Sequence, residues 1–100
     1  MKWIEIIRLR ALDHLKQTGV LELLRQIAAD QAAADVTFML YQHTKLANDM
    51  SIHLAWQTDV PEQGKSVLGQ QLACLLREFG FVDYSVWIET GSLNSGITPP

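Results

Sequence analysis

The chain of 100 residues is 48% hydrophobic and 19% charged, and its formal net charge is −3 at pH 7. This length favours a single domain with a modest core, and the apolar content excludes intrinsic disorder. Because 8 lysine and arginine residues stand against 11 aspartate and glutamate residues, the composition also excludes a general nucleic-acid binder, which needs a basic face for phosphates.

The N-terminus and the cysteine content predict the compartment. No apolar run approaches the ~20 residues that cross a bilayer, and Glu5 interrupts the stretch that would be apolar in a secretory signal. The single cysteine, Cys74, excludes an internal disulfide and a cysteine-based zinc cluster. We therefore expect a cytoplasmic protein without a membrane span.

The first third of the chain predicts a strand followed by a helix. Residues 3–12 are rich in isoleucine and leucine and indicate a strand that is apolar on much of both faces. Apolar residues then recur along one helical face and predict a helix over residues 19–30. Gly19 interrupts this pattern, so residues 13–19 are interpreted as a looser turn or loop.

The middle of the chain predicts a hairpin. Apolar and polar residues alternate over residues 36–43 and again over residues 51–58, which is typical of half-buried strands. Asn48-Asp49 lies between them and supplies residues that are common at a hairpin tip.

The last part of the chain predicts a second helix and a final strand. Ser66 is a suitable N-cap for the leucine-rich helix, and Gly80 supplies its stop. Alternation indicates a strand over residues 82–89. Residues 90–100 have little to bury and are expected to form a mobile tail, which leaves residues 1–89 as the single domain.

The element order favours an α+β, ferredoxin-like βαββαβ fold, in which a four-stranded antiparallel sheet has both helices on one face. The more apolar residues of each alternating strand should face the helices: Val36, Phe38, Leu40, Ile52, Leu54, Trp56, Val82, Tyr84, Val86 and Ile88. The opposite face then carries Met39, Tyr41, His43, His53, Ala55 and Trp87. Since monomers rarely expose large apolar patches, we expect a homodimer that packs sheet against sheet; the alternative is a wetter face with scattered apolar residues.

Two stretches near the second helix carry a family resemblance. They run from Ser66-Val67-Leu68-Gly69 through Leu72-Ala73, and from Phe79-Gly80-Phe81-Val82 into Ser85-Val86-Trp87-Ile88-Glu89. With the element order over residues 2–89, they resemble the dimeric α/β-barrel proteins, and within these the antibiotic-biosynthesis-monooxygenase-like group. The resemblance implies a homodimer with ligand pockets, and the group includes cofactor-independent oxygenases of quinol-like aromatics. No catalytic motif matches, so no catalytic residue is carried over.

The candidate catalytic residues are His53, His43 and Tyr41, which alternation places on one face of neighbouring strands. Cross-strand neighbours approach within about 5 Å, and the hairpin register decides whether Tyr41 or His43 stands opposite His53. A buried neutral imidazole can take a proton from a phenolic substrate. Met39 and Trp87 on the same face are the candidate substrate-binding residues.

A metal site at the two histidines would need a third ligand, and Glu5 or Glu89 would have to supply it. We expect neither a metal nor a cofactor, and a structural role for the histidines is the alternative to a chemical one.

Two functions fit this interpretation. The first is a monooxygenase-like enzyme that acts without a cofactor on a small aromatic or quinol-type substrate. The second is a non-enzymatic module of the same fold that binds a small apolar molecule or another protein. A closed pocket at His53 or His43 would favour the enzyme.

Overall fold

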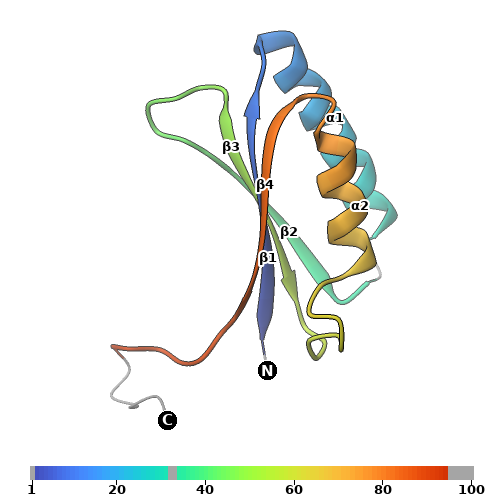
Figure 1. Ribbon diagram of the computed structural model, residues 1–100, viewed down its shortest axis with the longest axis vertical. Helices are drawn as coiled ribbons and strands as arrows, with labels where there is room; N and C mark the ends of the chain where they lie inside the picture. Colours follow the sequence, from blue (N-terminus) through green and yellow to red (C-terminus); the bar gives the residue numbers. More distant parts are fainter. Residues whose placement is uncertain (1, 32–33, 95–100) are drawn as a thin grey trace.

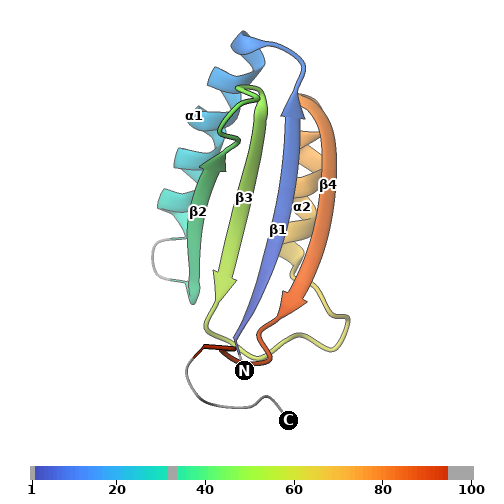
Figure 2. The same cartoon turned by 90° about the vertical axis from the view of Figure 1, so that its left-hand side faces the viewer.

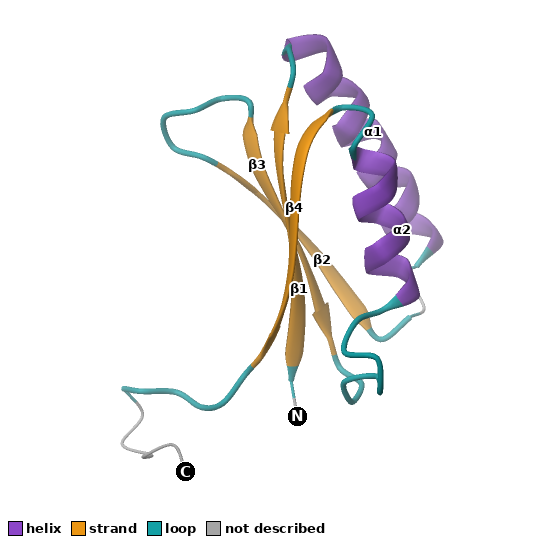
Figure 3. Ribbon diagram, viewed as in Figure 1, coloured by secondary structure: helices purple, strands orange, loops and turns teal. Residues whose placement is uncertain are grey.

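The computed structural model describes residues 2–31 and 34–94 of the chain, which form four strands and two helices in the order βαββαβ. The elements are β1 (Trp3–Ala11), α1 (His14–Asp30), β2 (Val36–Gln42), β3 (Asp49–Trp56), α2 (Val67–Leu76) and β4 (Gly80–Ile88). All strand pairs are antiparallel, and the strand order is β2-β3-β1-β4 (Figure 2). Both helices cover one face of this sheet (Figures 1 and 3). The predicted ferredoxin-like α+β fold is confirmed.

Alternation of burial in the two central strands separates the two faces of the sheet. In β1, every second residue from Trp3 to Ala11 is buried against the helices. Two of the three predicted helix-facing residues of β3, Ile52 and Leu54, are 1% and 0% exposed, and the third, Trp56, is half-buried. The edge strands are covered less completely, since Leu40 of β2 and Ile88 of β4 are 41% and 48% exposed. The core is therefore centred on β1 and β3.

Helix α1 is longer than the sequence predicted. It begins at His14, and its N-cap Asp13 accepts a hydrogen bond from the backbone N–H of Lys16 at 2.8 Å. Gly19 does not break the helix but lies inside it. A Cβ at this position would come within 2.9 Å of the ring of Phe79. The glycine lets the ring approach the helix, so its role is packing rather than termination.

The remaining element boundaries differ from expectation by a few residues. Asp49, which was predicted at the hairpin tip, is the first residue of β3. Helix α2 begins after its predicted N-cap Ser66, whose Oγ accepts from the N–H of Gly69 at 2.8 Å. The helix ends at Leu76, and β4 begins at Gly80, before the predicted start.

The described chain continues for a few residues beyond β4 without regular structure. Residues 90–94 form neither strand nor helix, and the rest of the predicted tail, residues 95–100, lies outside the described residues. Within the described ranges, no helix is long and apolar enough to cross a membrane.

One carboxylate lies at the centre of the helix-covered face. Glu5 of β1 is 0% exposed. Its Oε1 accepts from the indole N–H of Trp56 at 2.7 Å and from the hydroxyl of Ser66. Its Oε2 accepts from the backbone N–H of Ser66 at 3.1 Å and from the hydroxyl of Tyr84. The donors belong to β3, the N-terminus of α2 and β4, so this carboxylate joins three elements to the central strand.

Two features close the surroundings of Glu5. A Cβ on Gly69 of α2 would lie 2.6 Å from Glu5 Cδ, so only glycine lets the helix approach the carboxylate. The indole of Trp56 stacks on that of Trp3, with ring centroids 5.4 Å apart and planes 11° apart. These contacts exclude water from the carboxylate.

Gly69→Ala should therefore destabilise the protein, although helix propensity alone predicts a gain of about 1 kcal/mol. We expect a loss of about 1–3 kcal/mol in urea unfolding, because the added methyl collides with Glu5. In a Glu5→Ala background, the same substitution should no longer destabilise. Gln70→Ala, at the exposed neighbouring position, serves as the control, and a stabilising Gly69→Ala would contradict the contact.

Tyr84 makes the unfolding free energy of the protein decrease at alkaline pH. Burial, and then the hydrogen bond to Glu5, raise the pKa of the phenol well above its ordinary value. The unfolded chain therefore loses this proton first, so the contribution of Tyr84 is complete below about pH 10 and declines as the pH rises further. The unfolding free energy of Tyr84→Phe should be lower than that of the wild type by about 1–3 kcal/mol at neutral pH. This difference should shrink above about pH 10, whereas Tyr41→Phe should retain the alkaline decline.

Candidate functional site

The sheet face opposite the helices, here called the open face, carries the alternate residues of all four strands (Figure 2). They are Ile4, Ile6, Arg8 and Arg10 of β1, Thr37, Met39 and Tyr41 of β2, Asp49, Ser51, His53 and Ala55 of β3, and Phe81, Asp83, Ser85 and Trp87 of β4. Four of its large apolar side chains are 47–74% exposed: Met39, Tyr41, Trp87 and Phe81. Sequence alternation placed Met39, Tyr41, His53, Ala55 and Trp87 on this face, whereas Phe81 precedes the predicted start of the last strand.

His53 occupies the middle of the open face. Its register partners are Ile6 on β1 and Met39 on β2. Its Nε2 lies 3.0 Å from Ser51 Oγ, and its ring contacts that of Tyr41, with centroids 4.6 Å apart and planes 50° apart. The pKa of His53 is lowered by burial, which favours the neutral imidazole. The site therefore offers a neutral base beside a phenol.

His43 lies at the end of the hairpin and does not meet His53. Its Nδ1 accepts hydrogen bonds from the backbone N–H groups of Lys45 at 3.0 Å and Leu46 at 3.1 Å, so this imidazole stabilises the loop. Its backbone N–H bonds the carbonyl of Asp49. His53 is four residues beyond Asp49 on β3, which separates it from the His43 end of the hairpin by about 13 Å at the usual rise of a strand. The register pairs Met39 with His53, and Tyr41 reaches the imidazole diagonally.

The residues that were considered as a third metal ligand do not join the histidines. Glu5 points to the helix-covered face, where its oxygens are occupied by hydrogen bonds. Glu89 lies just beyond β4, at the opposite end from His43. In the described part of the chain, no group of three or more histidine, cysteine, aspartate or glutamate side chains could hold a metal ion.

The candidate binding residues flank His53 at different distances. Met39 is its neighbour on β2, whereas Trp87 lies on the far edge strand β4, opposite Ile4 of β1. The indole N–H of Trp87 donates to Ser85 Oγ at 2.8 Å. Trp87 can therefore contact a molecule that spans the sheet, but not one that is confined to the vicinity of His53.

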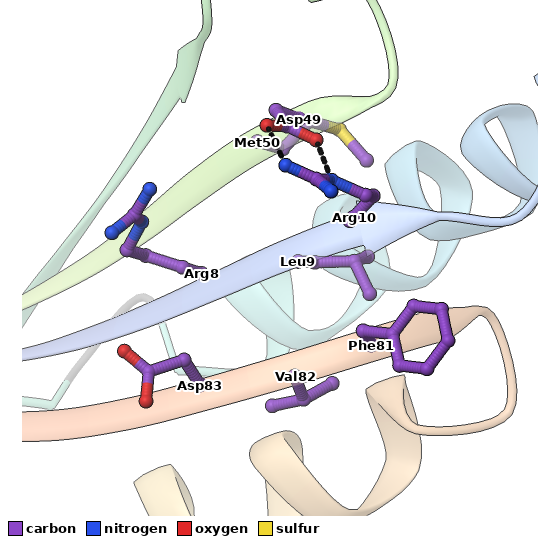
Figure 4. Close-up of a pocket in the computed structure, with 8 residues that line it drawn as sticks. All are labelled: Arg8, Leu9, Arg10, Asp49, Met50, Phe81, Val82 and Asp83. Carbon is purple, nitrogen blue, oxygen red and sulfur yellow. Dashed lines mark hydrogen bonds and ion pairs between the residues drawn. The ribbon is translucent and has the colours of Figure 1, made fainter.

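A charged hollow lies at the hairpin end of the open face (Figure 4). Arg10 forms a two-pronged ion pair with Asp49, with N–O distances of 2.8 and 3.2 Å, and this contact lowers the pKa of the carboxyl. A shallow pocket of about 240 Å³ lies beside the pair and is also lined by Arg8, Phe81 and Asp83. These charges are not among the candidate site residues that alternation of the sequence predicts.

An apolar groove of about 220 Å³ runs between α1 and the edge strand β2. It is lined by Leu21, Leu24, Arg25, Ala28, Phe38, Met39, Leu40 and Ile52. Arg25 is the one charged residue of this lining, so the groove suits an apolar ligand and offers no acid–base group.

Comparisons of the chain with protein-family models, with curated proteins and with solved structures find no match.

The protonation of His53 can be followed by NMR. Because burial lowers its pKa, the midpoint for the imidazole signals should lie below about 6.5. Folding favours the neutral imidazole, so the contribution of His53 to the unfolding free energy is complete above the ordinary pKa of about 6.5. This contribution is lost as the pH falls through the lowered pKa of the folded state. Tyr41→Ala should raise the midpoint by exposing the ring, whereas Thr37→Ala at the end of β2 should not. A wild-type midpoint at or above the ordinary value would contradict the burial.

Proposed function

We propose that two copies of the chain pack through their open faces and enclose a cavity at His53, where a small aromatic or quinol-type molecule reacts without a cofactor. This is the chemistry of the monooxygenase-like group of dimeric α/β-barrel proteins that the sequence resembles. The observation that carries the proposal is His53 itself, a partly buried imidazole in the centre of a face with large exposed apolar side chains.

The sizes of the surrounding side chains favour a cavity. Ser51 and Ala55 flank His53 on its own strand, and both are too small to fill the space above the sheet. Met39 and Tyr41 rise beside them on β2 and are 47% and 48% exposed. A second sheet packed about 10 Å away would rest on the large side chains and leave room above the small ones.

The proposed reaction needs one base and molecular oxygen. Neutral His53 takes a proton from an acidic C–H or O–H group of the substrate, and the resulting electron-rich anion reduces O2 without help from a metal or flavin. A substrate with a reactive CH2 group then becomes a ketone: RCH2R′ + O2 gives RCOR′ + H2O, with one oxygen atom in each product. The ring of Tyr41 packs against the imidazole and holds it in place.

A non-enzymatic binding module is the second candidate. The observation that favours it is the apolar groove between α1 and β2, which has no acid–base residue except the permanently charged Arg25. A ligand held there would pack on Leu24 and Phe38 rather than on the imidazole of His53.

Anthrone, an aromatic compound with an acidic CH2 group, tests the enzymatic proposal. The wild type should accelerate O2 uptake and form anthraquinone and water, and kcat/KM should rise with pH through a midpoint below about 6.5. His53→Ala should reduce the rate by about 10²–10⁴-fold, and added imidazole should restore part of it.

The control variant is Thr37→Ala, which lies on the same face opposite Ala55 rather than opposite His53 and should keep the wild-type rate. Anthrone binding without O2 uptake would favour the binding module. A rate that does not change in His53→Ala would overturn the assignment of the base.

A further inference from the structure

We propose that Arg8 of one copy forms an ion pair with Asp83 of a second copy, so that two such pairs, related by a two-fold axis, orient the open faces. This inference rests on the proposed homodimer and specifies how its two copies recognise each other.

The first observation is that Arg8 and Asp83 do not pair within one chain. They are direct register partners on the adjacent strands β1 and β4, a position in which opposite charges usually attract each other. Figure 4 shows the two side chains diverging, with the Arg8 guanidinium directed away from the Asp83 carboxylate. Among the described residues, neither side chain forms a hydrogen bond or ion pair, whereas the neighbouring Arg10 and Asp49 are joined twice.

The second observation is the charge balance of the open face. A two-fold interface joins the same patch of both copies, so the patch must be complementary to itself. Within the four strands, the face carries two arginines and two aspartates. Arg10 and Asp49 neutralise each other, which leaves one charge of each sign. A neutral face of this kind does not favour a nucleic acid or an acidic peptide, and it matches a second copy of itself.

The third observation is the apolar surface around these charges. Phe81 is 74% and Trp87 58% exposed on the same strand as Asp83. Four strands about 4.8 Å apart and eight residues long, at about 3.3 Å per residue, present a face of about 500 Å². Two such faces bury about 1,000 Å², which reaches the minimum for a specific interface. Covering this area removes water from Arg8 and Asp83, and buried charges are tolerated only when they are paired.

A charge-reversal experiment tests the pairing. In homodimers of Arg8→Asp or of Asp83→Arg, both contacts join like charges, so each variant alone should dissociate at least tenfold more readily than the wild type. In a mixed dimer, both contacts join opposite charges. We therefore expect light scattering to give about 11.3 kDa for either variant at micromolar concentration and about twice 11.3 kDa for the equimolar mixture. Native mass spectrometry should identify the mixed species.

The matched controls are Arg10→Asp and Asp49→Arg, whose ion pair lies within one chain. Their mixture should show no preference for mixed dimers, because each broken pair remains broken. A preference there would mean that net charge alone drives mixing and would overturn the inference. Circular dichroism melts check that each variant is folded, and Arg8→Gln with Asp83→Asn replaces the reversals if one does not fold. The neutral variants should then show coupled, non-additive effects on dimer dissociation.

The outcomes separate the two proposals. A monomeric wild type at micromolar concentration would overturn both the homodimer and the pairing. A dimeric wild type whose variants remain dimeric alone, or do not recover on mixing, would overturn the pairing and leave the homodimer.

Discussion

The buried carboxylate of Glu5 is the interaction on which the arrangement of the other elements depends. Removing a carboxylate from water is costly, and the cost is offset only when several donors surround it. Trp56, Ser66 and Tyr84 supply those donors, and the positive end of the α2 dipole lies beside them. Because they come from three elements, the helix, β3 and β4 must all reach their final positions before the charge is satisfied. The network thus ties α2, β3 and β4 to the central strand through directional hydrogen bonds.

Fixing the helix-covered face also fixes the open face. Side chains alternate along a strand, so a shift of one residue in register would exchange the two faces. Glu5 and the buried Ile52 and Leu54 prevent that shift in the two central strands. His53 lies between Ile52 and Leu54 in sequence, so its position is set by neighbours that point into the core. The candidate base is therefore carried by one of the most firmly held strands of the molecule, and its surroundings vary only through the edge strands.

Local patterns in the sequence predicted much of the fold and part of the site. Alternation placed Met39, His53 and Trp87 on one face, and the cap at Ser66 placed α2, because both signals depend on near neighbours in the chain. The purpose of Gly19 was not visible, because it depends on Phe79, which is 60 positions away in the chain. The burial of Glu5 was missed for the same reason: its donors are 51, 61 and 79 residues distant. The separation of His43 from His53 required the hairpin register, which composition does not determine.

The central position of β1 has a consequence for synthesis on the ribosome. This strand is made before the other five elements, yet both of its neighbours in the sheet, β3 and β4, are made later, and β4 ends only at Ile88. Until then β1 lacks its pairing with β4, and Glu5 lacks the hydrogen bond from Tyr84. Contacts of such long sequence separation form slowly. A nascent chain arrested before Tyr84 would hold an incomplete sheet and an unsatisfied carboxylate. Such a fragment should depend on chaperones in a way that the finished domain does not.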